Sequence, residues 1–340
     1  MDSTISSLNT LSSDTAVAKA VGTLAPTTTT SSAKAASQIS AGISGVIATQ
    51  QNRSGSGLNA GDYIQFDDKT MWVKTFGSLG KQHDKDGENG FDTNAYGLGI
   101  GADGEYTKDQ KIGLAMFYTR ANVDVNNVDQ TSNMDVISAI VYGSNLFGDN
   151  ATTLSYQAGY SWQKTSSDRQ LFTGETASAD YTSTTASLDV KLAHKFDIDS
   201  KLSISPKIGT TYRYFNNPAY SETGVGANLI VDKFSTTELL GNAGAEVSYK
   251  LAEKSSIVAN LSAGYNFRDT TNNVSSAFEG ASDVRFDSQS IDNGRWRYEA
   301  GLGYDARINE VSSINVSYDF QAQGTDFTNN VLSAKYEYKF

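Results

Sequence analysis

The 340-residue chain has no cysteine, fewer basic than acidic residues and no long apolar run. The absence of cysteine excludes thiolate metal sites and cysteine nucleophiles. The net charge of -11 argues against nucleic acid as a partner, because phosphate binding needs clustered lysine and arginine. Only 38% of the residues are hydrophobic and the mean hydropathy is -0.40, so no window approaches the apolar run of a transmembrane helix.

Aromatic residues and glycine are plentiful, with 18 tyrosines, 15 phenylalanines and 30 glycines against 3 prolines. This mixture is typical of a transmembrane β-barrel, in which each strand is half polar and aromatic side chains form belts at the two membrane interfaces. We expect Trp72, Trp162 and Trp296 in these belts. A soluble all-β domain shares part of this composition, so the hydrophobic pattern within the strands is needed to distinguish the two.

From residue 70 to Phe340 the hydrophobic pattern repeats every second residue. Residues 296–305 show it most clearly, with two alternating sets: Trp296, Tyr298, Ala300, Leu302 and Tyr304 against Arg297, Glu299, Gly301, Gly303 and Asp305. Lipid outside and water or polar protein inside would impose this division. Short turns alternate with long polar loops, as in bacterial outer-membrane barrels. We therefore predict that residues 70–340 form an all-β, about twelve-stranded antiparallel transmembrane β-barrel.

The best helical segment precedes the strands, at residues 32–53. Its predicted lumen-helix residues recur at helical spacing: Ala36, Ile39, Ile43, Val46, Ile47, Gln50 and Arg53. A helix of this length matches the thickness of a bilayer core, but its polar groups and glycines do not suit a lipid-facing span. We therefore expect an N-terminal α-helix that threads the barrel lumen. Residues 1–31 are expected to be a partly helical linker segment on the N-terminal side, and residues 54–69 a second linker.

Three glycines in the second predicted strand, Gly97, Gly99 and Gly101, alternate with residues that would face lipid. They are therefore expected on the lumen wall, where the missing side chains would allow a close approach of the helix backbone. The alternative is that they only ease the curvature of the barrel.

Charged residues also fall on the predicted inner face: Arg213, Glu246, Arg268, Arg297, Glu299 and Asp305. Buried charges need partners, so we expect them to pair with one another and with helix groups such as Gln50 and Arg53. A lumen filled in this way would conduct ions poorly. The alternative is that the same charges line an open, water-filled channel, as they would in a porin.

Two patterns resemble chemical sites but have simpler explanations. Residues 99–104 satisfy G-x-G-x-x-G, yet a nucleotide site needs a helix directly after that motif, and here a further strand is predicted. His83 lies with Asp84 and Asp86 on the first long loop, where they resemble a catalytic pair but also an ordinary polar loop. We expect no catalytic residue, no metal and no cofactor.

The segment 71–78 (MWVKTFGS), the acidic glycine-containing loop after it and the segment 93–118 resemble the opening of the autotransporter β-domain. The upstream helices and the terminal Phe340 match this family as well. The resemblance implies a type V secretion translocator in the bacterial outer membrane, which exports an N-terminal passenger to the cell surface while a helix plugs the pore. The long loops would then be extracellular. A passive outer-membrane channel or porin, and a surface barrel enzyme, are the alternatives.

The resemblance also implies partners and a signal. Tyr336, Tyr338 and Phe340 would form the C-terminal signal read by the barrel-assembly machinery, and periplasmic chaperones, outer-membrane lipid, lipopolysaccharide and the chain's own passenger would be further partners. One subgroup of the family cleaves its helix at an Asn-Asn pair, but this chain has Ala48 and Thr49 there, so we do not expect that activity. The N-terminus has no charged region followed by an apolar core, so a signal peptide is missing and we expect a piece of a longer precursor.

Overall fold

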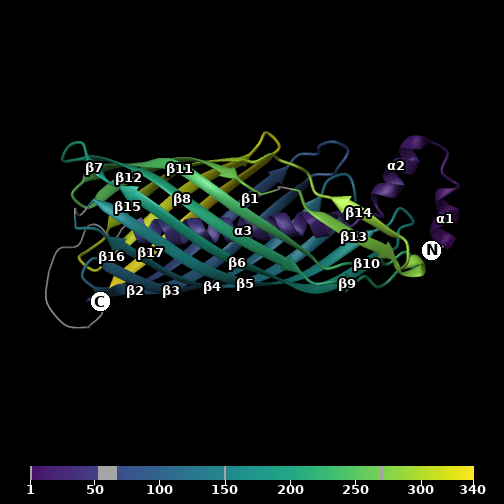
Figure 1. Ribbon diagram of the computed structural model, residues 1–340, viewed down its shortest axis with the longest axis horizontal. Helices are drawn as coiled ribbons and strands as arrows, with labels where there is room; N and C mark the ends of the chain where they lie inside the picture. Colours follow the sequence, from purple (N-terminus) through teal and green to yellow (C-terminus); the bar gives the residue numbers. More distant parts are fainter. Residues whose placement is uncertain (1, 53–66, 149–150, 269–270) are drawn as a thin grey trace.

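The computed structural model describes residues 2–52, 67–148, 151–268 and 271–340. Twelve long strands form one antiparallel sheet that closes into a barrel (Figure 1), because the first strand pairs with the last and the seventh long strand pairs with the eighth. These strands are β1 (Asp67–Gln82), β2 (Phe91–Thr107), β3 (Gln110–Val125), β4 (Gln130–Leu146), β5 (Thr152–Gln170), β6 (Thr176–His194), β8 (Leu202–Asn217), β11 (Phe234–Ala252), β12 (Ser255–Asn266), β15 (Trp296–Arg307), β16 (Ser312–Gln323) and β17 (Phe327–Lys339). The prediction of an antiparallel barrel with about twelve strands is confirmed.

The alternation in the sequence corresponds to the two faces of the barrel wall. In β3, Leu114 and Met116 are 65% and 57% exposed on the outer face, whereas Ala115 and Phe117 between them are buried toward the lumen. Apolar side chains on the outer face suit a lipid environment, and the inner face is free to carry polar groups.

Two of the three tryptophans lie on the outer face, as an interface belt requires. Trp162 and Trp296 are about half exposed on the outer face of the barrel. The expectation was wrong for Trp72, which is 2% exposed and faces the lumen. In β1 the outward positions belong to Met71 and Val73, so the alternation turns Trp72 inward.

The two ends of the barrel differ. At one end, the short-turn end, tight connections join β2 to β3 and β11 to β12. At the other, the long-loop end, longer segments such as 218–233 and 267–295 connect the strands. Near the short-turn end, β7 (Phe196–Asp197) adds a brief pairing to β8.

Among the described residues before the barrel there are three helices: α1 (Asp2–Leu8), α2 (Asp14–Gly22) and α3 (Thr27–Asn52). The helix α3 runs through the lumen, while α1 and α2 lie beyond the long-loop end (Figure 1). It begins at Thr27, earlier than the expected start at residue 32. Pro26 directly before it can begin a helix but not sit inside one, and the following threonines are buried by the loops around them. No helix in the described ranges is both long enough and apolar enough to span a membrane.

A second, four-stranded sheet covers the long-loop end. It consists of β14 (Arg285–Gln289), β13 (Asn273–Phe278), β10 (Leu229–Val231) and β9 (Tyr220–Ser221), in that order, with the short helix η2 (Glu279–Ala281) after β13. Leu229, Val231 and Val274 form its small buried core. We call this sheet the cap. The long loops were expected to be polar connections, so the cap is a feature that the sequence analysis missed.

Candidate functional site

The lumen is the candidate site, and one side of it is apolar. The helix α3 packs most closely on β3, β4 and β5, which positions Ile39, Ile43, Val46 and Ile47 against inward side chains of the wall. Ile47 is fully buried. The wall contributes large apolar and aromatic residues: Trp72, Phe76, Phe91, Phe117, Val123, Met134, Val136, Ile140 and Tyr142. We call this inner face of β1–β4, with the helix side chains on it, the apolar half. Ala36 lies nearer the cap, against Phe215.

The three predicted lumen glycines do not receive the helix backbone. A Cβ at Gly99 would lie 2.2 Å from the ring of Phe117, and one at Gly101 would lie 2.3 Å from the indole of Trp72. Gly97 is covered in the same way by Phe76. The expectation of a close helix approach was therefore wrong, because large inward side chains of β1 and β3 lie over the glycines directly across the strand pairs.

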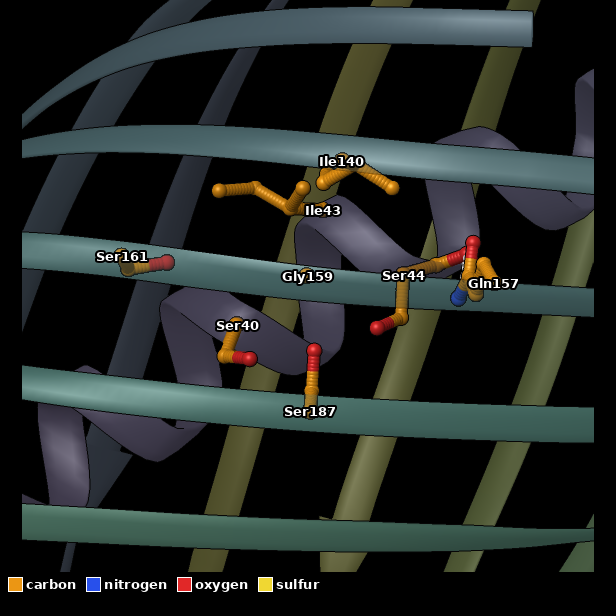
Figure 2. Close-up of a pocket in the computed structure, with 8 residues that line it drawn as sticks. All are labelled: Ser40, Ile43, Ser44, Ile140, Gln157, Gly159, Ser161 and Ser187. Atoms are coloured by element: carbon orange, nitrogen blue, oxygen red, sulfur yellow. Dashed lines mark hydrogen bonds between the residues drawn. The ribbon is translucent and has the colours of Figure 1, made fainter.

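Figure 2 shows where the apolar contacts of the helix end and the polar contacts begin. Ile43 lies beside Ile140 of β4, and one residue later Ser44 lies beside Gln157 of β5. The Gln157 amide donates to the Ser44 carbonyl oxygen at 3.3 Å. A void of about 10 Å³ remains between these strands and the helix, which is roughly the space of one water molecule.

Neutral and charged hydrogen bonds hold the C-terminal part of α3 near the short-turn end. The Gln50 amide donates to Asp103 at 3.0 Å, and its carbonyl oxygen accepts from the Lys335 ammonium. Asp103 also accepts from the Tyr142 hydroxyl at 2.7 Å, and that hydroxyl accepts from the Trp72 indole at 2.8 Å. The network therefore links α3 to strands β1, β2, β4 and β17.

The neighbouring Gln51 has two backbone acceptors. Its amide donates to the carbonyl oxygens of Gly143 at 2.8 Å and Tyr156 at 2.7 Å. Arg53, the other expected partner of the wall charges, lies outside the described residues. Gln50 does contact charged wall groups, but these are Asp103 and Lys335, and the sequence analysis selected neither.

The opposite side of the lumen is charged. Arg213 of β8 and Arg297 of β15 both pair with Glu238 of β11, at N–O distances of 2.6 Å and 3.2 Å. The sequence analysis expected Arg213 and Arg297 to pair with the other selected charges or with the helix, but both pair with Glu238, which it did not select. The signal was available, because Glu238 alternates with outward Leu239. We call the inner face of β6, β8, β11, β12, β15 and β16 the charged half.

Three other predicted wall charges lie on inner strand positions. Glu299 accepts from the Ser262 hydroxyl at 3.4 Å, and Asp305 accepts from the Asn315 amide at 2.9 Å. Glu246 is half-buried on β11.

The fourth, Arg268, was predicted on the lumen wall and is not there. It is exposed and follows the end of β12 at Asn266. The Asn266 side chain accepts the backbone N–H of Arg268 at 3.1 Å and so ends the strand before it. The period-2 pattern could not predict that β12 ends before Arg268, because the end of the strand depends on one side-chain hydrogen bond.

A buried ion pair holds the N-terminal side of α3 at the long-loop end. Arg169 of β5 is 1% exposed and binds both carboxylate oxygens of Glu222. The same guanidinium donates to the carbonyl oxygens of Thr23, at 2.9 Å, and of Ala227, at 3.0 Å. Thr23 lies just before α3, so the pair ties the chain that leads into the helix to a strand and to the loop of the cap. We call these contacts the latch.

In the first long loop the Asp84 carboxylate accepts hydrogen bonds from groups other than the His83 imidazole. Asp84 accepts hydrogen bonds from the backbone of Gly90 and from the amides of Asn126 and Asn127, at 2.7–2.8 Å. The hydrogen bond from Asn126, together with those from Gly90 and Asn127, lowers the pKa of the Asp84 carboxyl. This carboxylate is used to hold the loop. Within the described ranges, no group of three His, Asp or Glu side chains is arranged to hold a metal ion.

Comparison with known proteins identifies the barrel. The family model described as autotransporter beta-domain matches residues 71–319. The chain belongs to the autotransporter β-domain family. As such a domain it anchors in the outer membrane and exports an N-terminal passenger, and α3 lies inside its barrel.

Two solved autotransporter structures share the fold of this β-domain. The translocator domain of autotransporter NalP from Neisseria meningitidis has a TM-score of 0.70 at 15% identity, over 89% of this chain and 98% of that one. The β-domain of the Bordetella autotransporter BrkA has a TM-score of 0.59 at 18% identity, over 81% of this chain and all of that one. An extracellular serine protease of Serratia marcescens is 25% identical over 290 residues, or 84% of this chain. The chain spans only 27% of that protease's length.

Proposed function

We propose that α3 enters the barrel from the cell-surface side, tethers the exported passenger there and seals the lumen after export. The observation that carries this proposal is the direction of α3. Its first residues are bound at the long-loop end, where Thr28 donates to Gln130, and its last at the short-turn end, where Gln50 donates to Asp103. Long loops face outward in outer-membrane barrels, so the chain before α3 leaves on the cell-surface side.

Planar-bilayer conductance tests the seal. The full chain should give small or flickering current steps, whereas a variant that lacks residues 1–60 should give large and steady ones, because nothing then fills the lumen. The same barrel strands are present in both proteins, so the difference reports on the N-terminal segment alone. Equally large steps from both would overturn the seal and favour the porin alternative.

The direction of α3 can be tested on whole cells. An epitope inserted after Thr10, between α1 and α2, should be accessible to antibody on intact cells if the long-loop end is outside. A matched epitope in the turn between β11 and β12, at Glu253, should become accessible only after the outer membrane is opened. The reverse pattern would contradict the proposed orientation.

The C-terminal residues fit an assembly signal. Tyr336, Tyr338 and Phe340 are 46%, 44% and 62% exposed on the outer face, and the Tyr338 and Phe340 rings stack at 6.4 Å. We infer that the barrel-assembly machinery reads them, after periplasmic chaperones deliver the chain, and that lipid and lipopolysaccharide surround the finished barrel. Loss of Phe340 should then lower the amount of assembled barrel and leave the total amount of chain unchanged.

The barrel itself is proposed to have no enzymatic activity, and the protease name belongs to a relative of which this chain spans a small part. His83 is the residue to test, because it lies beside Asp84 on an exposed loop. Any hydrolytic activity measured with the barrel should be unchanged when His83 is replaced by alanine, and a loss of activity in that variant would support the enzyme alternative.

A further inference from the structure

The helix α3 leaves part of the lumen unfilled. A cavity of about 130 Å³ lies between α3 and the charged half, large enough for several water molecules. Its lining extends from Ser155, near the short-turn end of β5, to Gln321, near the long-loop end of β16. On the helix the lining runs from Ala41 to Gln51, so the space lies along the C-terminal half of α3.

The helix face toward this cavity consists of small residues. Ala41, Ser44, Gly45 and Ala48 line it, and no heavy atom lies within 4 Å of a Cβ built on Gly45. The opposite face of the same helix carries isoleucine and valine. The open space is thus a consequence of the helix sequence.

Most charged groups on the cavity wall have an ion-pair or hydrogen-bond partner. Arg213 and Arg297 pair with Glu238. Asp189 accepts hydrogen bonds from the hydroxyls of Ser44 and Thr211 and from the amide of Gln157, at 3.1, 2.5 and 3.0 Å. The remaining carboxylate of the lining, Glu299, accepts from two neutral side chains.

Two lysines of the lining differ from these groups. Lys191 of β6 and Lys207 of β8 stand diagonally across one strand pair, since Lys191 is opposite Gly209 and Lys207 is opposite Ala193. Side chains at diagonal positions on one face of a sheet are within reach of each other. Neither ammonium donates a hydrogen bond or forms an ion pair with any residue in the described ranges, although both line a cavity that can hold water.

We infer that the space beside α3 is an aqueous passage that prefers anions, with Lys191 and Lys207 as its selectivity site for small anions such as chloride. Two adjacent ammonium groups repel each other unless an anion or water lies between them. The lining carries four cationic side chains, Lys191, Lys207, Arg213 and Arg297, against two carboxylates, Asp189 and Glu299. In a narrow passage with low-dielectric walls, an excess of charge of one sign concentrates ions of the opposite sign. Glu299 and Asp189 in the lining, and Glu246 on the inner face of β11, attract the Lys191 ammonium as well and would weaken but not reverse this effect.

The test is the reversal potential of the full chain in planar bilayers under a KCl gradient. We expect a small conductance step whose reversal potential lies on the chloride side. In the variant Lys191→Gln/Lys207→Gln the anion-to-cation permeability ratio should fall at least about twofold, while the conductance step remains small. The matched control is Lys81→Gln/Lys233→Gln, which removes the same charge from exposed positions at the long-loop end and should leave the ratio unchanged.

The inference rests on the proposed seal, and the two can fail separately. Large steps from the full chain, equal to those of the variant without residues 1–60, would overturn the seal. Small steps in the full chain with a ratio that the two glutamines do not change would overturn only the selectivity site. A full chain that carries no current, beside a truncated chain that conducts, would show a complete seal and overturn the passage.

Discussion

The two halves of the lumen wall consist of the same kind of alternating strand, but they contact the helix α3 differently. In the apolar half, isoleucines and valines of α3 pack against aromatic rings, so water is excluded and burial stabilises the docked helix. In the charged half, small helix residues face a cavity and charged side chains that keep it polar. The alternation of each strand determines which residues face inward. The types of those residues then determine whether α3 packs tightly against the wall or a cavity remains beside it.

The largest effect is expected when a charge is placed on the helix face toward the apolar half, which tests whether the two halves differ. In Ile47→Asp a carboxylate would replace a fully buried side chain of the apolar cluster. We expect the free energy of helix docking to fall by about 5 kcal/mol, because the desolvation of the carboxylate adds to the lost packing. Conductance should rise toward that of the truncated barrel.

The neighbouring residue provides the control. Ala48→Asp places the same carboxylate on the cavity side, where Lys191 also lies. It should leave α3 in place. Trp72 can report on both variants when Trp162 and Trp296 are changed to phenylalanine, because its indole is buried under the helix and its emission should shift to the red when the helix leaves. Equal effects of the two aspartates would show that the halves do not differ.

The latch is a third kind of contact, in which a buried ion pair binds the chain just before α3. In Arg169→Met the Glu222 carboxylate would stay buried without its cation, which should cost about 3–5 kcal/mol. The latch lies outside the strands' apolar contacts with α3, so we expect the cap and the segment before Thr27 to loosen first. Protease cleavage between Thr23 and Thr27 on intact cells measures this loosening.

A double variant separates the loss of the ion pair from the loss of a buried side chain. Arg169→Met/Glu222→Leu leaves no unpaired charge and should recover part of the protection. If the single and double variants are cleaved equally fast, the hydrogen bonds to Thr23 and Ala227 matter more than the charges.

The sequence predicted the barrel and the threaded helix because both depend on local periodicity. Alternation identified Arg213 and Arg297 as inward residues, and the helical repeat identified Ile43 and Ile47. Contacts between residues far apart in the chain have no such signal. Glu238, for example, is linked to Arg297 only through the pairing of β11, β12 and β15.

The cap and the aromatic rings over the glycines show the same limit. Strands of two to six residues, such as β9, β10 and β13, are too short for alternation to be recognised, and they are stabilised by packing on one another and near α3. Phe117 covers Gly99 because the register of β2 and β3 places them opposite each other. Registers between strands are set by the whole barrel, so the sequence of one strand could not predict this contact.

Glycines on the two halves of the wall should respond differently to a methyl group. In Gly99→Ala the new Cβ would lie 2.2 Å from the Phe117 ring, so the ring must move against the helix, at a cost of about 1–3 kcal/mol. Gly303→Ala in the charged half is the control, because the nearest atom, the Asn315 amide nitrogen, is 3.6 Å away and the contact is ordinary. Urea midpoints of helix release, read from Trp72 emission, should fall only for Gly99→Ala.

The smallest expected effect is a gain in stability on the cavity side of α3. Gly45→Ala adds a methyl group where no heavy atom lies within 4 Å, and alanine favours a helix over glycine by about 0.5–1 kcal/mol. The urea midpoint of helix release should therefore rise slightly. Gly42→Ala, which also meets nothing within 4 Å, should behave in the same way. A lower midpoint for both variants would mean that wall side chains close over this face of the helix in solution, and the space assigned to the charged half would then be absent.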